Sequence, residues 1–214
     1  MSKVQSLKVI GLTGPVGAGK DEAAKILRRR GAFVIDADEA AHTLYGRQSP
    51  AWSQLVKTFG SRILIRGGEI NRKKLAEIVF SDKRKLKELD RIVHPFLKEA
   101  IVKITGDQKA MPAGRQAERE KQKTGIRNQI IVINAAVLKE IGLIDHVDEV
   151  WVVMAAKAAR MKRLVRSGLS KEEAQKRIGS QASQKEYLKM ADVVIRNDGT
   201  LKQLNAKVQA CFQV

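Results

Sequence analysis

The sequence predicts an α/β fold built on a five-stranded parallel sheet, and three observations lead to this prediction. Short runs rich in Val and Ile recur along the chain, as in strands that are covered on both faces. Stretches with apolar residues at helical spacing separate these runs, so strand and helix alternate with right-handed crossovers. The length of 214 residues suits a single domain with a sizeable core. The five runs are Leu7–Leu12, Ala32–Asp36, Ile130–Asn134, Val150–Met154 and Val193–Ile195.

Helices are expected between these strands. One should run from Asp21 to about Arg30, and another from Glu39 to Tyr45. Residues 37–129 are too long a segment for a simple connection between two strands. Apolar residues recur at helical spacing between residues 75 and 97, so the sequence predicts a helical lobe outside the sheet. Within it, residues 106–127 contain three Gly, one Pro and few apolar side chains, and we expect a mobile surface loop there.

The composition excludes several classes of protein. Hydrophobic residues make up 43% and charged residues 30% of the chain, as in a soluble globular protein. The single cysteine, Cys211, rules out an internal disulfide framework and a Cys-based zinc site, and it suits a reducing compartment. No apolar run approaches 18 residues and no signal peptide is recognisable, so we expect a cytoplasmic protein without a membrane span.

The net charge of +18 favours anionic partners without naming one. Much of the excess lies in residues 157–189, which carry ten Lys or Arg against three Glu. Aromatic residues amount to only 4%, and no basic stretch has interleaved aromatics of the kind that stack on bases. A specific nucleic-acid partner is therefore not expected, whereas phosphorylated small molecules are.

The strongest motif is a phosphate-binding loop after the first strand. Its seven residues, 14–20, read GPVGAGK and match the pattern GxxxxGK between a strand and a helix. Glycines let the backbone curl around phosphate oxygens, the helix N-terminus adds partial positive charge, and Lys20 neutralises the β- and γ-phosphates. The predicted nucleotide-binding residues of this loop are Gly14, Gly17, Ala18, Gly19, Lys20, Asp21 and Glu22.

One position departs from the motif. The residue after Lys20 is usually a Ser or Thr whose hydroxyl ligates magnesium, but here it is Asp21, followed by Glu22. A carboxylate can ligate Mg²⁺, and it also brings negative charge close to the phosphates. Both acidic residues could instead complement the N-terminus of the helix.

Two carboxylates follow the second strand, at Asp36 and Asp38. The carboxyl ends of strands in an open α/β sheet face the ligand crevice, so a carboxylate there could accept the proton of a hydroxyl that attacks the γ-phosphate. Asp36, at the strand tip, is the predicted base. Asp38 is equally well explained as the N-cap of the helix from Glu39 to Tyr45.

At this point the chain resembles the dephospho-coenzyme A kinase family. The resemblance is carried by GLTGPVGAGK at 11–20, VIDAD at 34–38, GGEINRKKLAEIVF at 67–80, LKELDRIVHPFLKE at 86–99, SGLSKEEAQKRIGSQ at 167–181 and ADVVIRNDGT at 191–200. It implies a three-layer P-loop kinase fold with a five-stranded parallel sheet, a helical substrate lobe and a lid. The implied activity is transfer of the γ-phosphoryl group of ATP, with Mg²⁺, to the 3′-hydroxyl of dephospho-CoA, the last step of CoA biosynthesis.

The resemblance also assigns residues. It implies that Asp36 is the base and that Asp38, Arg72, His94 and Glu140 belong to the acceptor site. Without it, Arg72 reads as a surface cation and His94 as part of a capped turn before Pro95.

The lid is expected in residues 158–189. Arg160, Arg163 and Arg166 recur at helical spacing, and closing that helix over ATP would bring guanidinium groups to the triphosphate. By resemblance, Lys162 and Arg166 match two spaced lid arginines of the family. Lys162 replaces the first of these arginines, and Arg163, one residue later, could compensate for it. Asn197 matches a position that implies adenine contact. The predicted organisation is a nucleotide-binding core of 1–36, 129–157 and 190–214, an acceptor lobe of 37–128 and a lid of 158–189.

Two other functions remain open from the sequence. The same fold could phosphorylate another small acceptor, such as a nucleoside monophosphate. Alternatively, Asp21 could make the chain a nucleotide-binding protein with weak or no kinase activity. ATP and dephospho-CoA are the expected small-molecule partners, and the chain could act as a monomer.

Overall fold

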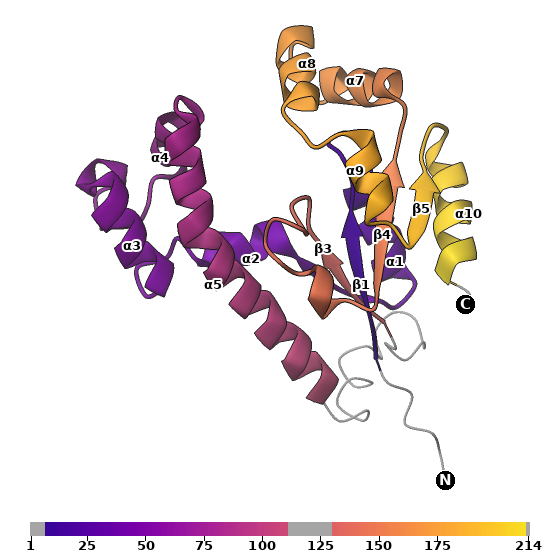
Figure 1. The fold of residues 1–214 in the computed structure, drawn as a ribbon, viewed down its shortest axis with the longest axis horizontal. Coiled ribbons are helices and arrows are strands. Elements are labelled where there is room, and N and C mark those ends of the chain that lie inside the picture. Colours follow the sequence, from indigo (N-terminus) through magenta and orange to yellow (C-terminus); the bar gives the residue numbers. More distant parts are fainter. Residues whose placement is uncertain (1–6, 111–129, 213–214) are drawn as a thin grey trace.

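A computed structural model describes residues 7–110 and 130–212 (Figure 1). A five-stranded parallel sheet lies at its centre, in the order β2-β3-β1-β4-β5. The strands are β1 (Lys8–Thr13), β2 (Phe33–Asp36), β3 (Ile130–Asn134), β4 (Glu149–Met154) and β5 (Val193–Arg196). The five predicted strands are all present, with bounds within one residue of those expected from the sequence.

Alternate residues of the strands face opposite layers, as both-sided burial requires. Val9 of β1 and Ile131 of β3 belong to a core shared with the helical lobe, whereas Ile10 and Val132 belong to a second core. The second core is closed by α1 (Lys20–Arg29) and α10 (Leu201–Phe212). The sheet is thus the middle of three layers.

The segment between β2 and β3 forms the predicted helical lobe, which extends to one side of the sheet (Figure 1). Local signals explain its helix starts: Ser49 caps α3 with Pro50 at its first position, and Asn71 caps α4. The 28-residue α5 packs against α2, α3 and α4 through a buried stripe that includes Val93, Leu97 and Ile101. The lobe consists of α2 (Ala37–Thr43), α3 (Pro50–Phe59), the 3-10 helix η1 (Ser61–Ile63), α4 (Arg72–Phe80) and α5 (Lys83–Ala110).

The remaining helices lie beyond β3. A 3-10 helix, η2 (Ile144–His146), precedes β4, and the predicted lid residues form α7 (Lys157–Arg166), α8 (Lys171–Gly179) and α9 (Gln184–Lys189). Figure 1 shows α7 and α8 above the sheet, at the end where its strands point, and α9 beside β4 and β5. Ser170 and Ser183 start α8 and α9 with capping boxes. The exact division of the chain into core, lobe and lid stays a prediction.

Three local expectations were wrong. Residues 106–110, assigned to a mobile loop, continue α5 beyond its last buried residue, Thr105; residues 111–127 of that loop lie outside the described part of the chain. The helix after β2 begins at Ala37 with Asp36 as its N-cap, so Asp38 lies within the first turn and does not cap it. His94 and Pro95 lie inside α5, and there is no turn before Pro95.

Candidate active site

The phosphate-binding loop connects β1 to α1 at the carboxyl end of the sheet. Gly14 passes so close to β4 that a β-carbon there would collide with the carbonyl oxygen of Val153. Gly19 has φ +97° and precedes α1 as its N-cap without a side-chain cap, which leaves the first amides of the helix available to a ligand. A ten-residue helix opening on a glycine loop is the geometry that binds phosphate groups.

Lys20 sits at the bottom of this loop with only 10% of its side chain exposed. Its ammonium donates hydrogen bonds to Oδ1 of Asn134, at 2.7 Å, and to Oδ1 of Asp21, at 2.8 Å. The register of the sheet places Asn134, at the end of β3, beside Leu12 of β1 and Asp36 of β2. The lysine is therefore held among the tips of three strands.

Asp36 is joined to the same group through Asn134. The amide nitrogen of Asn134, a residue only 2% exposed, donates to Oδ2 of Asp36 at 3.0 Å and to Oδ1 of Asp21 at 3.2 Å. Oδ1 of Asp36 accepts the backbone N–H groups of Asp38, at 2.9 Å, and Glu39, at 3.3 Å. The predicted base is thus also the helix cap, and these bonds fix its carboxylate at the edge of the phosphate site.

Asp21, which departs from the motif, is the exposed member of the cluster, with 72% of its side chain accessible. Burial alone would raise the pKa of its carboxyl, but the hydrogen bond and charge of Lys20 and the bond from Asn134 outweigh it, and the pKa lies below its usual value. The ionised carboxylate suits Mg²⁺, which takes oxygen ligands and is often held by one carboxylate together with phosphates and water. Glu22 instead pairs with Lys25 at 2.7 Å along α1.

The predicted lid arginines contact the loop through its backbone. Arg163 donates to the carbonyl oxygens of Gly17 and Ala18, at 3.1 and 3.2 Å, and to that of Asn197 at 2.6 Å. Arg160, one turn earlier, donates to the carbonyl oxygen of Val16 at 2.8 Å. Arg166 and Lys162 are exposed. The structure brings Arg160 and Arg163 to the outer side of the loop.

Asn197 also touches the loop. It is 7% exposed, and its amide nitrogen donates to the carbonyl oxygen of Ala18 at 2.7 Å. A β-carbon at Gly19 would collide with that amide, so the glycine is required for this packing. The turn after β5 therefore forms one wall of the phosphate loop.

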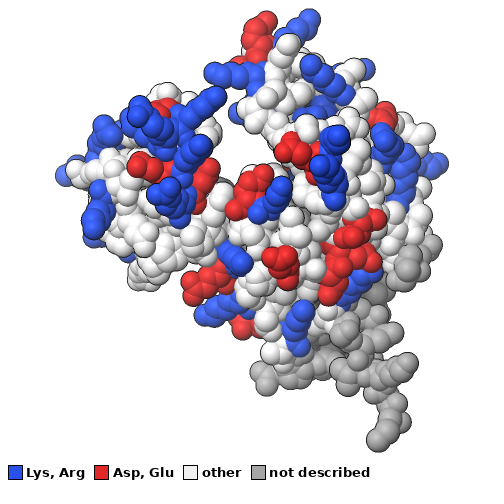
Figure 2. Space-filling view, viewed as in Figure 1, with Lys and Arg blue, Asp and Glu red and all other residues white. Residues whose placement is uncertain are grey.

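Two of the predicted acceptor residues meet in one cavity. Asp38 and Arg72 line a cavity of about 660 Å³ between α2, α4 and α5, together with His42, Tyr45 and other residues of these helices. Burial raises the pKa of the Tyr45 phenol, an effect that the nearby Arg72 cation reduces. Figure 2 shows many Lys and Arg side chains on the helical lobe and others across the hollow that separates it from the lid. An anionic molecule fits this setting.

The other two acceptor candidates lie elsewhere in the structure. His94 is on α5, outside the lining of this cavity, and its Nε2 is 3.6 Å from Oδ1 of Asp90 one turn earlier. Glu140 lines a smaller cavity of about 50 Å³ beside Thr13, Tyr187 and α9. The structure thus does not bring the four predicted residues together.

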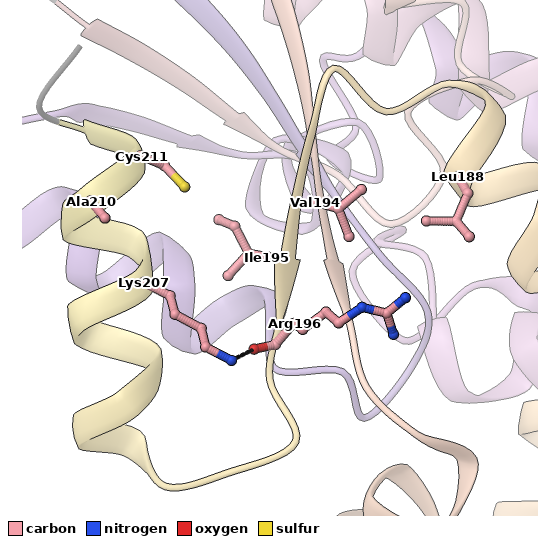
Figure 3. A pocket seen from close by; sticks show the side chains of 7 residues that line it. All are labelled: Leu188, Val194, Ile195, Arg196, Lys207, Ala210 and Cys211. Atoms are coloured by element: carbon pink, nitrogen blue, oxygen red, sulfur yellow. Dashed lines mark hydrogen bonds between the residues drawn. The ribbon is translucent and has the colours of Figure 1, made fainter.

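A third cavity, of about 460 Å³, lies on the far side of the molecule between β5, α9 and α10 (Figure 3). Its walls are mainly apolar, from residues such as Val194, Ile195 and Ala210, and Lys207 in it donates to the carbonyl oxygen of Arg196 at 2.8 Å. It contains none of the predicted site residues. Within residues 7–110 and 130–212, no cluster of three or more His, Cys, Asp or Glu could hold a metal ion, and no helix is long and apolar enough to cross a membrane.

Sequence reasoning missed two residues of the site. Asn134 is one of them, although a polar residue that closes the apolar run IIVIN is a signal of function at a strand tip. Gln181, in the link between α8 and α9, accepts the backbone N–H of Val16 at 2.8 Å. No local pattern marks it, because its partner lies 165 residues away in the sequence.

Comparison with known proteins extends these observations. The profile of a family described as dephospho-CoA kinase matches residues 8–203. A protein named dephospho-CoA kinase from Aquifex aeolicus is 35% identical over 207 residues, which cover 97% of each chain. The solved dephospho-CoA kinase from Campylobacter jejuni is 24% identical with a TM-score of 0.63, over 96% of this chain and 95% of that one.

A more distant solved structure has the same fold. Shikimate kinase from Acinetobacter baumannii, in complex with shikimate, aligns with a TM-score of 0.52 at 12% identity, over 98% of this chain and 93% of that one. At such identities these two structures show the fold alone. They confirm the expected three-layer P-loop kinase architecture.

Proposed function

The chain belongs to the dephospho-CoA kinase family, and from this premise we propose that it transfers the γ-phosphoryl group of ATP to the 3′-hydroxyl of dephospho-CoA. The products are coenzyme A and ADP, and the reaction completes CoA biosynthesis. The observation that carries the proposal within this chain is the cluster that joins Lys20 of the phosphate loop, through Asn134, to Asp36. It puts a phosphate-binding cation and a candidate base at one edge of the sheet.

The chemistry assigned to this cluster is one in-line transfer. Asp36 accepts the proton of the 3′-hydroxyl while that oxygen forms a bond to the γ-phosphorus. The bond between the γ-phosphorus and the oxygen that bridges it to the β-phosphorus breaks, and ADP leaves with the electron pair. Lys20 and the loop amides at the start of α1 balance the charge on the phosphates. Asn134 supports the role of Asp36 because its amide orients Oδ2.

Mg²⁺ is the expected cofactor, and when bound it would neutralise negative charge on the phosphates. Asp21 is our candidate ligand from the protein, because its carboxylate is exposed, ionised and next to Lys20. It would take the place of the usual Ser or Thr hydroxyl.

For the other substrate contacts, Asp38 and Arg72 are our candidates for the acceptor, supported by the cavity that they share. Gly14, Gly17, Ala18 and Gly19 would surround the triphosphate. Arg163, Arg166 and Asn197 remain predicted ATP contacts, and His94 and Glu140 remain predicted acceptor contacts. A cytoplasmic location and action as a monomer stay predictions from the sequence.

The test is release of ADP from Mg·ATP, with and without dephospho-CoA, by the wild type and by Asp36→Asn. Asparagine caps a helix as well as aspartate does, so the variant keeps α2 but cannot take the proton. We expect acceptor-dependent turnover in the wild type and a fall of about 10²–10⁴-fold in the variant. Its melting temperature should fall only slightly, because the side-chain oxygen still caps α2, while the new amide nitrogen faces Nδ2 of Asn134 and that one hydrogen bond is lost.

Three results would count against the proposal. If the wild type released no acceptor-dependent ADP, the kinase activity would be rejected. If a nucleoside monophosphate served better than dephospho-CoA, the assigned acceptor would be wrong. If Asp36→Asn kept full turnover, Asp36 would not be the base.

A further inference from the structure

The outer side of the phosphate loop is fastened to the lid by a set of hydrogen bonds that we call the lid–loop connection, made by Arg160, Arg163 and Gln181. Arg160 and Arg163 donate to the carbonyl oxygens of residues 16, 17 and 18. Gln181 accepts the N–H of Val16 at 2.8 Å. These contacts join segments that are more than 140 residues apart in the sequence.

Gln181 links the two halves of this connection. Its Oε1 atom accepts both the N–H of Val16 and, at 3.0 Å, the Nη2 group of Arg160. Arg160 in turn donates from Nε to the carbonyl oxygen of Val16. The peptide groups on both sides of Val16 are therefore held by one closed ring of hydrogen bonds.

The contacts are supported by close packing. A β-carbon at Gly17 would come within 3.0 Å of the carbonyl oxygen of Arg160, so the loop lies directly against the backbone of α7. Arg160 is half-buried, and among the described residues no carboxylate forms an ion pair with it. Its Nε group is bonded to the loop and its Nη2 group to Gln181.

The direction of these bonds bears on phosphate binding. In a trans peptide group the C=O and the N–H point in opposite directions. When the carbonyls of Val16 and Ala18 point toward α7, the N–H groups of Gly17 and Gly19 must point away from it, into the loop. The N–H groups that a phosphate needs are oriented by side chains that lie outside the loop.

We propose that Arg160 and Gln181 are positioning residues for the triphosphate, which hold the loop amides in their binding orientation without touching the nucleotide. This inference rests on the proposed function, since it assigns ATP to the loop. In this role the lid acts before any closure over the substrate. It orders the loop amides in the free protein, and preorganised amides lose less entropy when the nucleotide binds. Removal of the connection should therefore weaken the affinity for ATP and leave that for the acceptor unchanged.

The experiment measures dissociation constants for Mg·ATP and for dephospho-CoA separately, by calorimetry, in the wild type and in five variants. Gln181→Leu removes the shared acceptor, and Gln181→Glu keeps an oxygen that can accept both bonds. Gln209→Leu is the matched control, because Gln209 accepts a short hydrogen bond from Arg30 between α10 and α1, far from the loop.

We expect Gln181→Leu to raise the dissociation constant for ATP about tenfold, because the released loop must then be ordered when ATP binds. Gln181→Glu should recover most of that affinity, and dephospho-CoA binding and melting temperature should match those of the control. Arg160→Met should weaken ATP binding as well, and its combination with Gln181→Leu should cost less than the sum of the two, because both break one ring.

Three outcomes would overturn the inference. They are an unchanged affinity of Gln181→Leu for ATP, an equal loss for both substrates, and additive effects in the double variant. A wild type that bound no ATP would refute the proposed function, and the inference with it. A wild type that bound ATP, together with variants that bound it equally well, would refute only the inference.

Discussion

Replacement of Asn134 by leucine tests whether the cluster at the strand tips matters as a unit. Leucine has a similar branched shape but can neither accept from Lys20 nor donate to Asp36 and Asp21. In the wild type these bonds measure 2.7, 3.0 and 3.2 Å, and Asn134 is almost fully buried.

The loss in the free energy of unfolding depends on which former partners of Asn134 can form hydrogen bonds with water instead. Asp21 is largely exposed, so water replaces its bond, whereas the Lys20 side chain is only 10% exposed and its ammonium loses one of its two hydrogen bonds. A hydrogen bond to a charged group contributes about 1.5–3 kcal/mol, so we expect the free energy of unfolding to fall by about 2 kcal/mol. For a chain of this length that lowers the melting temperature by about 4–8 °C.

The assay is thermal unfolding followed by circular dichroism, combined with turnover under saturating substrates. Turnover of Asn134→Leu should fall at least about tenfold, because Asp36 loses the donor that orients Oδ2. Thr105→Val is the control, since Thr105 is a buried residue of α5, outside the cluster, whose hydroxyl donates to the carbonyl oxygen of Ile101. If Asn134→Leu melted and turned over like the wild type, the cluster would have no part in stability or catalysis.

Further predictions concern the loop, its acidic residue and the acceptor cavity. Gly14→Ala should lower the free energy of unfolding by about 3 kcal/mol, measured in urea, because the added methyl meets the backbone of β4. Asp21 has a lowered pKa in the folded state, so above the unfolded pKa of 3.8 its ion pair with Lys20 should make the free energy of unfolding of the wild type larger than that of Asp21→Asn. This difference in the free energy of unfolding should vanish as the pH falls through the folded pKa of Asp21. An equal difference at all pH values would contradict the ion pair as its cause. Arg72→Gln should raise the KM for dephospho-CoA about tenfold and leave that for ATP unchanged, whereas Lys74→Gln, on the same helix but outside the cavity, should change neither.

The sequence predicted the parts of the site that are encoded locally. Gly14 to Lys20 form a loop whose spacing is recognisable in seven residues, and Asp36 stands at the end of a strand whose apolar pattern is plain. The five strands could be found for the same reason, since each is a short run of apolar residues between polar ones.

What could not be predicted depends on contacts between distant segments. The hydrogen bonds from the Arg163 guanidinium to the carbonyl oxygens of Gly17 and Asn197 join residues that lie 146 and 34 positions apart in the sequence, and no local pattern indicates them. Gln181 looks like any polar residue in a link between helices until the fold brings it to Val16. The end of α5 could not be predicted because residues 106–110 carry a glycine and few apolar side chains, and in the structure they continue the helix beyond its last buried residue, Thr105.

The strand order has a consequence for how the protein comes into being during synthesis. β1 and β2 are consecutive in the chain but lie on either side of β3, which is made almost a hundred residues after β2. A nascent chain that ends before residue 130 has both outer partners and no strand to join them, so its sheet cannot close. The helical lobe, whose helices follow one another in sequence, can fold during this wait. Because Asn134 is the last residue of β3, the insertion that joins β1 to β2 also assembles the cluster around Lys20, so the phosphate site is complete only after this long-range step.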